Sequence, residues 1–334
     1  ISECLVGSEM CIRDRPCSGD LNTNRIIAAV KDGTLDEKIL DERVDTVVDL
    51  IVKSKPALEK THTYDVDAHH AIAQKIAEGS MQLLKNDDGI LPLKDGQKVA
   101  VIGEMAKAPR FQGAGSSVIN PTKLSNAFDE LQKLGVDISY AQGYYKSAPS
   151  KKDKTPRKTG AELIAEAKEA ASKADVAVVF VGLTEEFEGE GYDREGIEIP
   201  AEHNELVAAV AEANPNTVVV IAGGSVILMP WLKNVKGLLN SGLGGQAGGI
   251  AVANILTGKV NPSGKTSETY PRAFEDNPTY GNFPGGPVTS EHRESVYIGY
   301  RYYDAADIDV EFPFGYGLSY TCLLYTSDAA DEAR

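Results

Sequence analysis

The stretch Ala174-Asp-Val-Ala-Val-Val-Phe-Val181 decides the fold, because it contains a short, continuous apolar run from Val176 onward. Such runs are typical of strands that are buried on both faces of a parallel sheet. The chain continues as Gly182-Leu-Thr-Glu-Glu-Phe-Glu-Gly-Glu-Gly-Tyr-Asp-Arg194, with five carboxylates within nine residues. In open α/β sheets, ligands bind at the carboxyl ends of the strands. The sequence therefore predicts a functional loop at the end of a buried parallel strand.

This acidic loop, residues 182–194, has the composition of a proton-transfer site. Gly189 and Gly191 flank Glu190 and would let the backbone turn sharply enough to present that carboxylate. Clustered negative charge and partial burial disfavour ionisation, so we expect one carboxyl to stay protonated at neutral pH, as a general acid requires. The alternative is a solvated acidic turn that faces the N-terminus of a helix starting near Pro200.

Strands and helices alternate on either side of this loop, which predicts a doubly wound α/β domain with a largely parallel sheet. The expected strands are 98–103, 137–140, 176–181, 217–222 and 235–240, and the expected helices are 127–134, 161–174, 202–213 and 249–256. Glycine-rich loops follow four of these strands, at 112–117, 182–194, 223–225 and 241–249. We expect them to gather on one sheet edge and to form a site there.

The residues before this domain predict helices without strands. Helical periodicity covers 22–30 and 36–55 and then, beyond a polar linker, 66–84. Two helices cannot form a domain alone, so we expect 16–55 to be the end of a domain that begins upstream. Residues 258–321 are rich in loops and aromatic side chains, which favours a hairpin that covers the domain.

Both ends of the chain differ in character from the rest. Residues 1–15 and 322–334 look like translated sequencing-adapter read-through, of the kind found at the ends of metagenomic reading frames, and we exclude them from the fold prediction. A frayed natural terminus is the alternative for either end.

Composition and motifs exclude several classes of protein. A net charge of −15 without a Lys/Arg-rich face argues against nucleic acid or an anionic membrane as partner. Gly103 is followed by Glu-Met-Ala-Lys rather than by a dinucleotide fingerprint, and there is neither a Walker loop nor a nucleophile elbow. The histidines lack the spacing of metal ligands. We expect no cofactor, no metal and no membrane span; localisation stays open.

Several motifs in a fixed order resemble one family. They are Lys85-Asn-Asp-Asp-Gly-Ile-Leu-Pro-Leu93, Gln112-Gly-Ala-Gly-Ser-Ser117, Glu188-Gly-Glu-Gly-Tyr-Asp-Arg194, Met229-Pro-Trp231, Gly244-Gly-Gln-Ala-Gly248, Gly258-Lys-Val-Asn-Pro-Ser-Gly-Lys265, Gly299-Tyr-Arg-Tyr-Tyr-Asp304 and Phe312-Pro-Phe-Gly-Tyr-Gly-Leu-Ser-Tyr320. Each is weak alone, but together they resemble the second domain of glycoside hydrolase family 3, the β-glucosidase and β-xylosidase group. The resemblance runs from about residue 16 to 321.

The resemblance implies a retaining glycosidase in which a (β/α)8-like barrel supplies the nucleophilic aspartate and an αβα-sandwich domain supplies the acid/base glutamate. Glu190 aligns best with that acid/base, with Glu188 and Glu186 as near alternatives, and Ser116 with a position that reaches the substrate sugar. The implied organisation is the end of the barrel domain (16–55), a linker and entry helix (56–97) and the sandwich domain (98–321).

The motifs of the barrel, including its nucleophile, are absent from this sequence. We therefore expect a truncated β-glucosidase-like chain that is inactive by itself and whose partners are the missing barrel domain and an oligosaccharide or β-glucoside. The alternative is a sugar-binding or interaction module without catalysis.

Overall fold

The computed structural model describes residues 21–61, 63–148, 155–286 and 288–321. The chain divides into two compact units, residues 1–64 and 65–334, and each is described by itself. The two stretches expected to be read-through, 1–15 and 322–334, lie outside the described residues.

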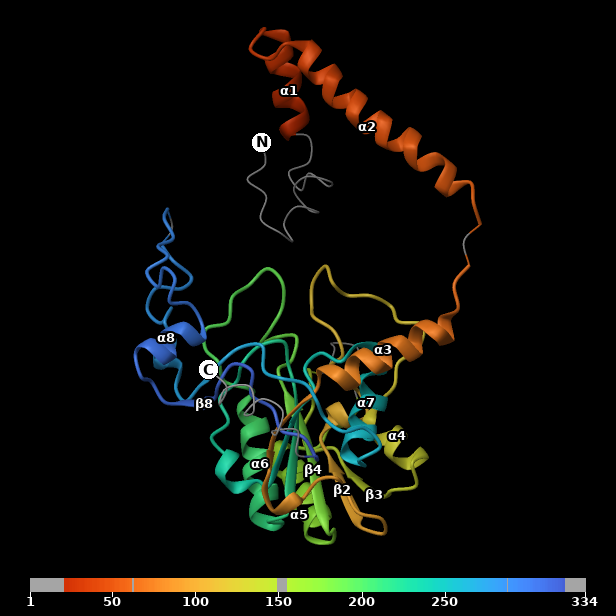
Figure 1. Cartoon of the computed structure of the whole chain (residues 1–334), viewed down its shortest axis with the longest axis vertical. Coiled ribbons are helices and arrows are strands. Elements are labelled where there is room, and N and C mark those ends of the chain that lie inside the picture. The colour runs from red at the N-terminus through yellow and green to blue at the C-terminus, as the bar shows by residue number, and fades with distance from the viewer. Residues whose placement is uncertain (1–20, 62, 149–154, 287, 322–334) are drawn as a thin grey trace, which may run out of the picture. The chain divides into compact units, whose positions relative to one another are not determined.

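The second unit is built on a six-stranded sheet of order β1-β6-β5-β4-β2-β3 (Figure 1). Its strands are β1 (Gln82–Asn86), β2 (Lys98–Ile102), β3 (Asp137–Ala141), β4 (Val176–Gly182), β5 (Thr217–Ala222) and β6 (Gly237–Asn240). All neighbours pair in parallel except β1, which runs antiparallel to β6. The predicted α/β class with a mostly parallel sheet is confirmed.

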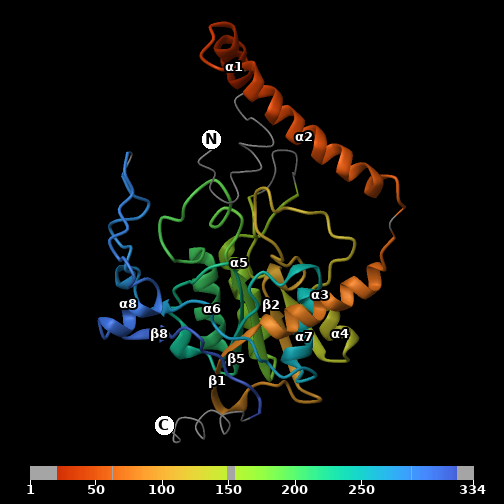
Figure 2. The same ribbon diagram turned by 45° about the horizontal axis from the view of Figure 1, so that its top comes forward.

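Helices cover both faces of this sheet (Figure 2). They are α3 (Val66–Ser80), α4 (Ala127–Lys133), α5 (Gly160–Ser172), α6 (Ala201–Ala213) and α7 (Gly248–Leu256). Helix α5 packs on α6, whereas α7 packs on α3 and α4. Every residue of β4 is buried between these layers, which explains why its sequence is continuously apolar rather than alternating.

The prediction of one helix over 66–84 is wrong. Helix α3 ends at Ser80, Met81 is extended, and the chain enters β1 at Gln82. An apolar segment this short fits a helix or a strand equally well, and here pairing with β6 decides between them. Strand β1 belongs to the sheet, and the compact unit that contains the sheet starts at residue 65.

The first unit contains α1 (Leu21–Lys31) and α2 (Glu37–Leu58). Asp36 caps α2 by accepting a hydrogen bond from the backbone N–H of Lys38. The helix includes Pro56, where the sequence predicts its end; a proline in the last turn removes only one helical hydrogen bond. No described residue of α2 is buried, and most of its apolar side chains, among them Val47 and Leu50, are exposed.

The last part of the chain contains β7 (Tyr270–Pro271), α8 (Tyr300–Ala305) and β8 (Val310–Phe312). Strands β7 and β8 pair antiparallel, and the rings of Tyr270 and Phe312 meet edge to face with their centroids 5.9 Å apart.

Across the part of the chain that the structure describes, we find no helix with the length and apolar character needed to cross a membrane.

Candidate active site

The acidic loop leaves the sheet at Gly182, in the centre of the domain. A side chain at this position would collide with the carbonyl of Ala222 on the neighbouring strand β5. Buried His203 of α6 lies beneath it, with Nδ1 3.0 Å from the carbonyl oxygen of Gly182. The base of the loop is thereby fixed by two elements of the core.

Glu190 lies against the glycine-rich loop that follows β2. One of its carboxylate oxygens, Oε2, accepts a hydrogen bond from the backbone N–H of Ser116 at 2.5 Å, and its own N–H donates to the carbonyl of Ala114 at 3.3 Å. Gly115 makes this approach possible, because a Cβ there would lie 2.5 Å from Cβ of Glu190. The structure thus brings together the predicted acid/base and the predicted sugar-binding residue.

The expectation that this loop keeps a carboxyl protonated does not hold for Glu190. Its side chain is exposed, and hydrogen bonds from the hydroxyl and the backbone N–H of Ser116 lower its pKa. Hydrogen bonds to a carboxylate favour the charged form, and at this exposed position they outweigh the opposing effect of desolvation on the pKa.

Glu188, the first alternative, is bound to the sheet edge. Its carboxylate accepts hydrogen bonds from the backbone N–H of Gly224 at 3.0 Å and from Oγ of Ser225 at 2.9 Å. Nη2 of Arg110 lies 3.4 Å from its Oε2. These three partners follow the carboxyl ends of β2 and β5, so Glu188 ties the loop to the sheet.

Glu186, the second alternative, is exposed and lines a cavity of about 250 Å³ together with Lys146 and Thr184. Among the hydrogen bonds and ion pairs of the described residues, Glu190 is the one candidate of the three that contacts the loop carrying Ser116. The geometry therefore favours Glu190 over both alternatives.

Two arginines hold the ends of the loop, and the sequence analysis did not single out the first of them, Arg110. Arg110 donates to the carbonyls of Leu183 at 3.1 Å and Glu188 at 2.9 Å. Arg194 donates to Oγ of Ser225 at 2.8 Å and to the carbonyl of Glu198 at 3.1 Å. Because the contacts of Arg110 join residues that are distant in sequence, no local pattern points to it.

The glycine-rich loops gather at one edge, as predicted. Besides the contacts of Glu190 and Glu188, the N–H of Gly245 donates to the carbonyl of Phe111 at 2.9 Å. This brings the loop before α7 against the segment that leads to Gln112.

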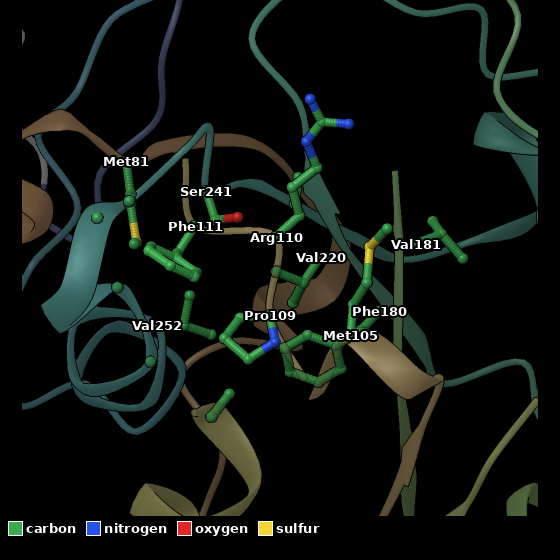
Figure 3. Close-up of a pocket in the computed structure, with 16 residues that line it drawn as sticks. Met81, Met105, Pro109, Arg110, Phe111, Phe180, Val181, Val220, Ser241 and Val252 are labelled. Atoms are coloured by element: carbon green, nitrogen blue, oxygen red, sulfur yellow. The ribbon is translucent and has the colours of Figure 1, made fainter. Parts of the chain in front are cut away.

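An apolar pocket of about 40 Å³ lies below this edge, between the ends of β4 and β5 and the start of α7 (Figure 3). Met81, Met105, Val220 and Val252 are among its lining side chains. Figure 3 shows the guanidinium of Arg110 pointing away from these apolar groups. A space of this size fits one or two water molecules.

The residues that the structure describes contain no group of three or more His, Cys, Asp or Glu side chains arranged to hold a metal ion. The chemistry that this edge offers is that of carboxylates, arginines and backbone N–H groups.

A family model described as the Glycosyl hydrolase family 3 C-terminal domain matches residues 81–320. The chain belongs to glycosyl hydrolase family 3. The predicted resemblance is thereby confirmed, and the six-stranded α/β unit described above carries nearly the whole of the matched domain.

Relatives of known name agree with this assignment. The chain is 44% identical to Thermostable beta-glucosidase B of Acetivibrio thermocellus, over 96% of this chain and 42% of that protein. It is 42% identical to an Exo-alpha-(1->6)-L-arabinopyranosidase of Bifidobacterium longum, over 92% of this chain and 41% of that protein. Among glycosyl hydrolase family 3 structures, it superimposes on a beta-glucosidase from Bifidobacterium adolescentis with a TM-score of 0.78 and 45% identity, over 90% of this chain and 43% of that chain.

Proposed function

We propose that this chain is the acid/base-carrying part of a retaining β-glycosidase, specifically a β-glucosidase, with Glu190 as the general acid/base. The observation that carries the proposal is the position of Glu190 at the carboxyl edge of the sheet, in hydrogen-bond contact with Ser116. It is supported by family membership and by relatives that are named as glycosidases.

The retaining reaction divides the work between two carboxyl groups about 5 Å apart. In the first step a carboxylate nucleophile attacks the anomeric carbon, while Glu190 donates its proton to the oxygen of the leaving group and the glycosidic bond breaks. In the second step the Glu190 carboxylate takes a proton from water, the water oxygen bonds to the anomeric carbon, and the nucleophile leaves as a carboxylate.

The first step requires protonated Glu190, whereas Ser116 lowers its pKa in this chain. Burial and a nearby second carboxylate both raise the pKa of a carboxyl group. We infer that the surface which supplies the nucleophile also covers Glu190, and that it raises the pKa to the range needed for acid catalysis.

The nucleophile is proposed to lie on a barrel domain outside this sequence. The chain spans about two fifths of the length of the curated relatives it matches, namely 42% and 41%. We assign residues 16–55 to the end of that barrel domain. The exposed apolar side chains of α2, such as Val47 and Leu50, agree with a helix that packs elsewhere in the complete protein.

The sugar that is released is a separate question, because relatives of nearly equal identity are named for a glucosidase and an arabinopyranosidase. We propose terminal β-linked glucose as the primary substrate and α-L-arabinopyranose as the second candidate.

The test uses this chain alone and the chain joined to the barrel domain of the Bifidobacterium adolescentis enzyme. We expect no hydrolysis of p-nitrophenyl β-glucoside by the chain alone and hydrolysis by the joined protein. A parallel assay with p-nitrophenyl α-L-arabinopyranoside ranks the two sugars. Activity of the chain alone would contradict the proposal that the nucleophile lies elsewhere.

A further inference from the structure

The acidic loop is anchored at both ends by a continuous series of polar contacts. Arg110 binds the carboxylate of Glu188, that carboxylate accepts a hydrogen bond from Oγ of Ser225, and Ser225 accepts one from Arg194. We call these four residues the loop clamp. Two of them, Glu188 and Arg194, belong to the acidic loop, and only the short segment 189–193, which contains Glu190, lies between these two.

The clamp also holds the backbone of the loop. Arg110 binds the carbonyls of Leu183 and Glu188, and Arg194 binds those of Val226 and Glu198. The side chain of Arg110 is only 4% exposed, so its contacts are shielded from solvent and salt. Hydrogen bonds between charged groups are about twice as strong as neutral ones.

We propose that the loop clamp is the positioning network for the acid/base, and that Glu188 is a positioning residue rather than an alternative proton donor. This inference rests on the proposed function of Glu190. Ser116 donates to the Glu190 carboxylate, but that carboxylate is on an exposed, glycine-flanked turn. Gly191 has a φ of +92°, so the turn depends on its anchors to keep one geometry.

Glu188 is suited to this role and unsuited to proton transfer. Three groups from two other loops already occupy its carboxylate, namely Gly224, Ser225 and Arg110. A proton donor must instead reach the leaving oxygen of a substrate within hydrogen-bond distance. The two nearby carboxylates therefore have different roles: Glu188 anchors the loop, and Glu190 transfers the proton.

The first test measures loop order in this chain and needs no catalysis. Hydrogen–deuterium exchange of peptides covering 184–194 is compared for the unmodified chain, Glu188→Ala and Ser225→Ala. Glu195→Gln serves as the control, since it removes a charge from an exposed side chain just beyond the same loop. We expect exchange about tenfold faster or more in Glu188→Ala, a smaller change in Ser225→Ala and none in the control. Unchanged exchange in Glu188→Ala would overturn the proposal.

The second test measures catalysis in the chain joined to the Bifidobacterium adolescentis barrel. We expect Glu188→Ala to lower kcat about 100-fold with little change in KM, Glu188→Gln to recover part of the loss, and azide to accelerate Glu188→Ala less than Glu190→Ala, in which the base is removed altogether. A greater acceleration by azide in Glu188→Ala than in Glu190→Ala would show that Glu188 is itself the acid/base and would overturn the proposal. If Glu190→Ala kept full activity, the proposed function would fail and with it the catalytic role of the clamp, whereas the exchange result would still report the anchoring of the loop.

Discussion

Oε2 of Glu190 accepts a hydrogen bond from the backbone N–H of Ser116 at 2.5 Å, although 74 residues separate the two in sequence. The contact joins the loop after β4 to the loop after β2, two neighbouring parallel strands. It depends on Gly115, whose φ of +95° turns the Ser116 N–H toward the carboxylate. The candidate catalytic group is thus oriented by backbone as well as by its own loop.

Gly115→Ala should displace Glu190. A Cβ at this position would lie 2.7 Å from Oε2 of Glu190, and the positive φ adds strain of about 1–3 kcal/mol. Gly135→Ala is the matched control, because Gly135 has a φ of +80° and a Cβ there would meet no atom within 4 Å. We expect both variants to lose stability in urea unfolding, but only Gly115→Ala to lower kcat of the barrel-joined protein. Equal kcat values would show that the close approach to Glu190 has no catalytic consequence.

Ser116→Ala should raise the pKa of Glu190 toward its ordinary value. Hydrogen bonds from the Ser116 hydroxyl and backbone N–H lower this pKa, and the substitution removes the first and keeps the second. Carbon-13 NMR titration of the chain, with Glu190→Gln to assign the resonance, measures the shift. A pKa that falls or stays the same in Ser116→Ala would contradict the described contact.

The pair Arg110 and Glu188 should show strong energetic coupling. Removal of one member of a largely buried pair leaves the other charge uncompensated, so we expect Arg110→Met to cost about 3 kcal/mol of unfolding free energy. In the Arg110→Met variant, the further substitution Glu188→Gln should lower the free energy of unfolding by much less than Glu188→Gln does alone. This difference corresponds to a coupling energy of about 1–3 kcal/mol. The exposed pair Lys168 and Glu212 is the control, with an expected coupling below about 0.5 kcal/mol. Similar couplings for the two pairs would contradict the burial argument.

His203 should make the chain less stable as the pH falls. Burial lowers its pKa from 6.5 to about 4, against a smaller opposing effect of the hydrogen bond with Gly182. Below pH 6.5 the unfolded state therefore takes up a proton that the folded state does not. The stability lost between pH 7 and pH 5 should be about 2 kcal/mol.

Urea unfolding of the chain and of His203→Gln at these two pH values measures this contribution. His203→Gln should be less stable than the unmodified chain at pH 7 but should lose about 2 kcal/mol less on acidification. His292→Gln, at an exposed position, should retain the full pH dependence. An unchanged pH dependence in His203→Gln would contradict the assignment of this loss of stability to His203.

The central strands of the fold could be predicted from sequence because burial on both faces leaves a local mark. Strand β4 is continuously apolar and is buried at every residue. Strand β1 could not be predicted, because its identity depends on antiparallel pairing with β6, which lies more than a hundred residues further along the chain. The adjoining apolar residues Met81, Leu83 and Leu84 fit a helix as well as a strand.

The candidate site was predictable in part. Composition locates the acidic loop, and the motif order points to Glu190 and Ser116, but neither gives the protonation state. The pKa of Glu190 depends on exposure and on donors from a distant loop, so the clustered carboxylates were misleading. Arg110 was missed because its acceptors, the carbonyls of Leu183 and Glu188, lie 73 and 78 residues away.

The most direct test of the central claim is azide rescue of Glu190→Ala in the chain joined to a family barrel domain, with p-nitrophenyl β-glucoside as substrate. This leaving group departs without protonation, so the variant should form the glycosyl-enzyme but hydrolyse it slowly, because no base activates water. We predict that azide restores turnover and yields the β-glucosyl azide, identified by NMR. Full activity of Glu190→Ala without azide, or a slow variant that azide does not accelerate, would contradict the assignment of Glu190 as the acid/base.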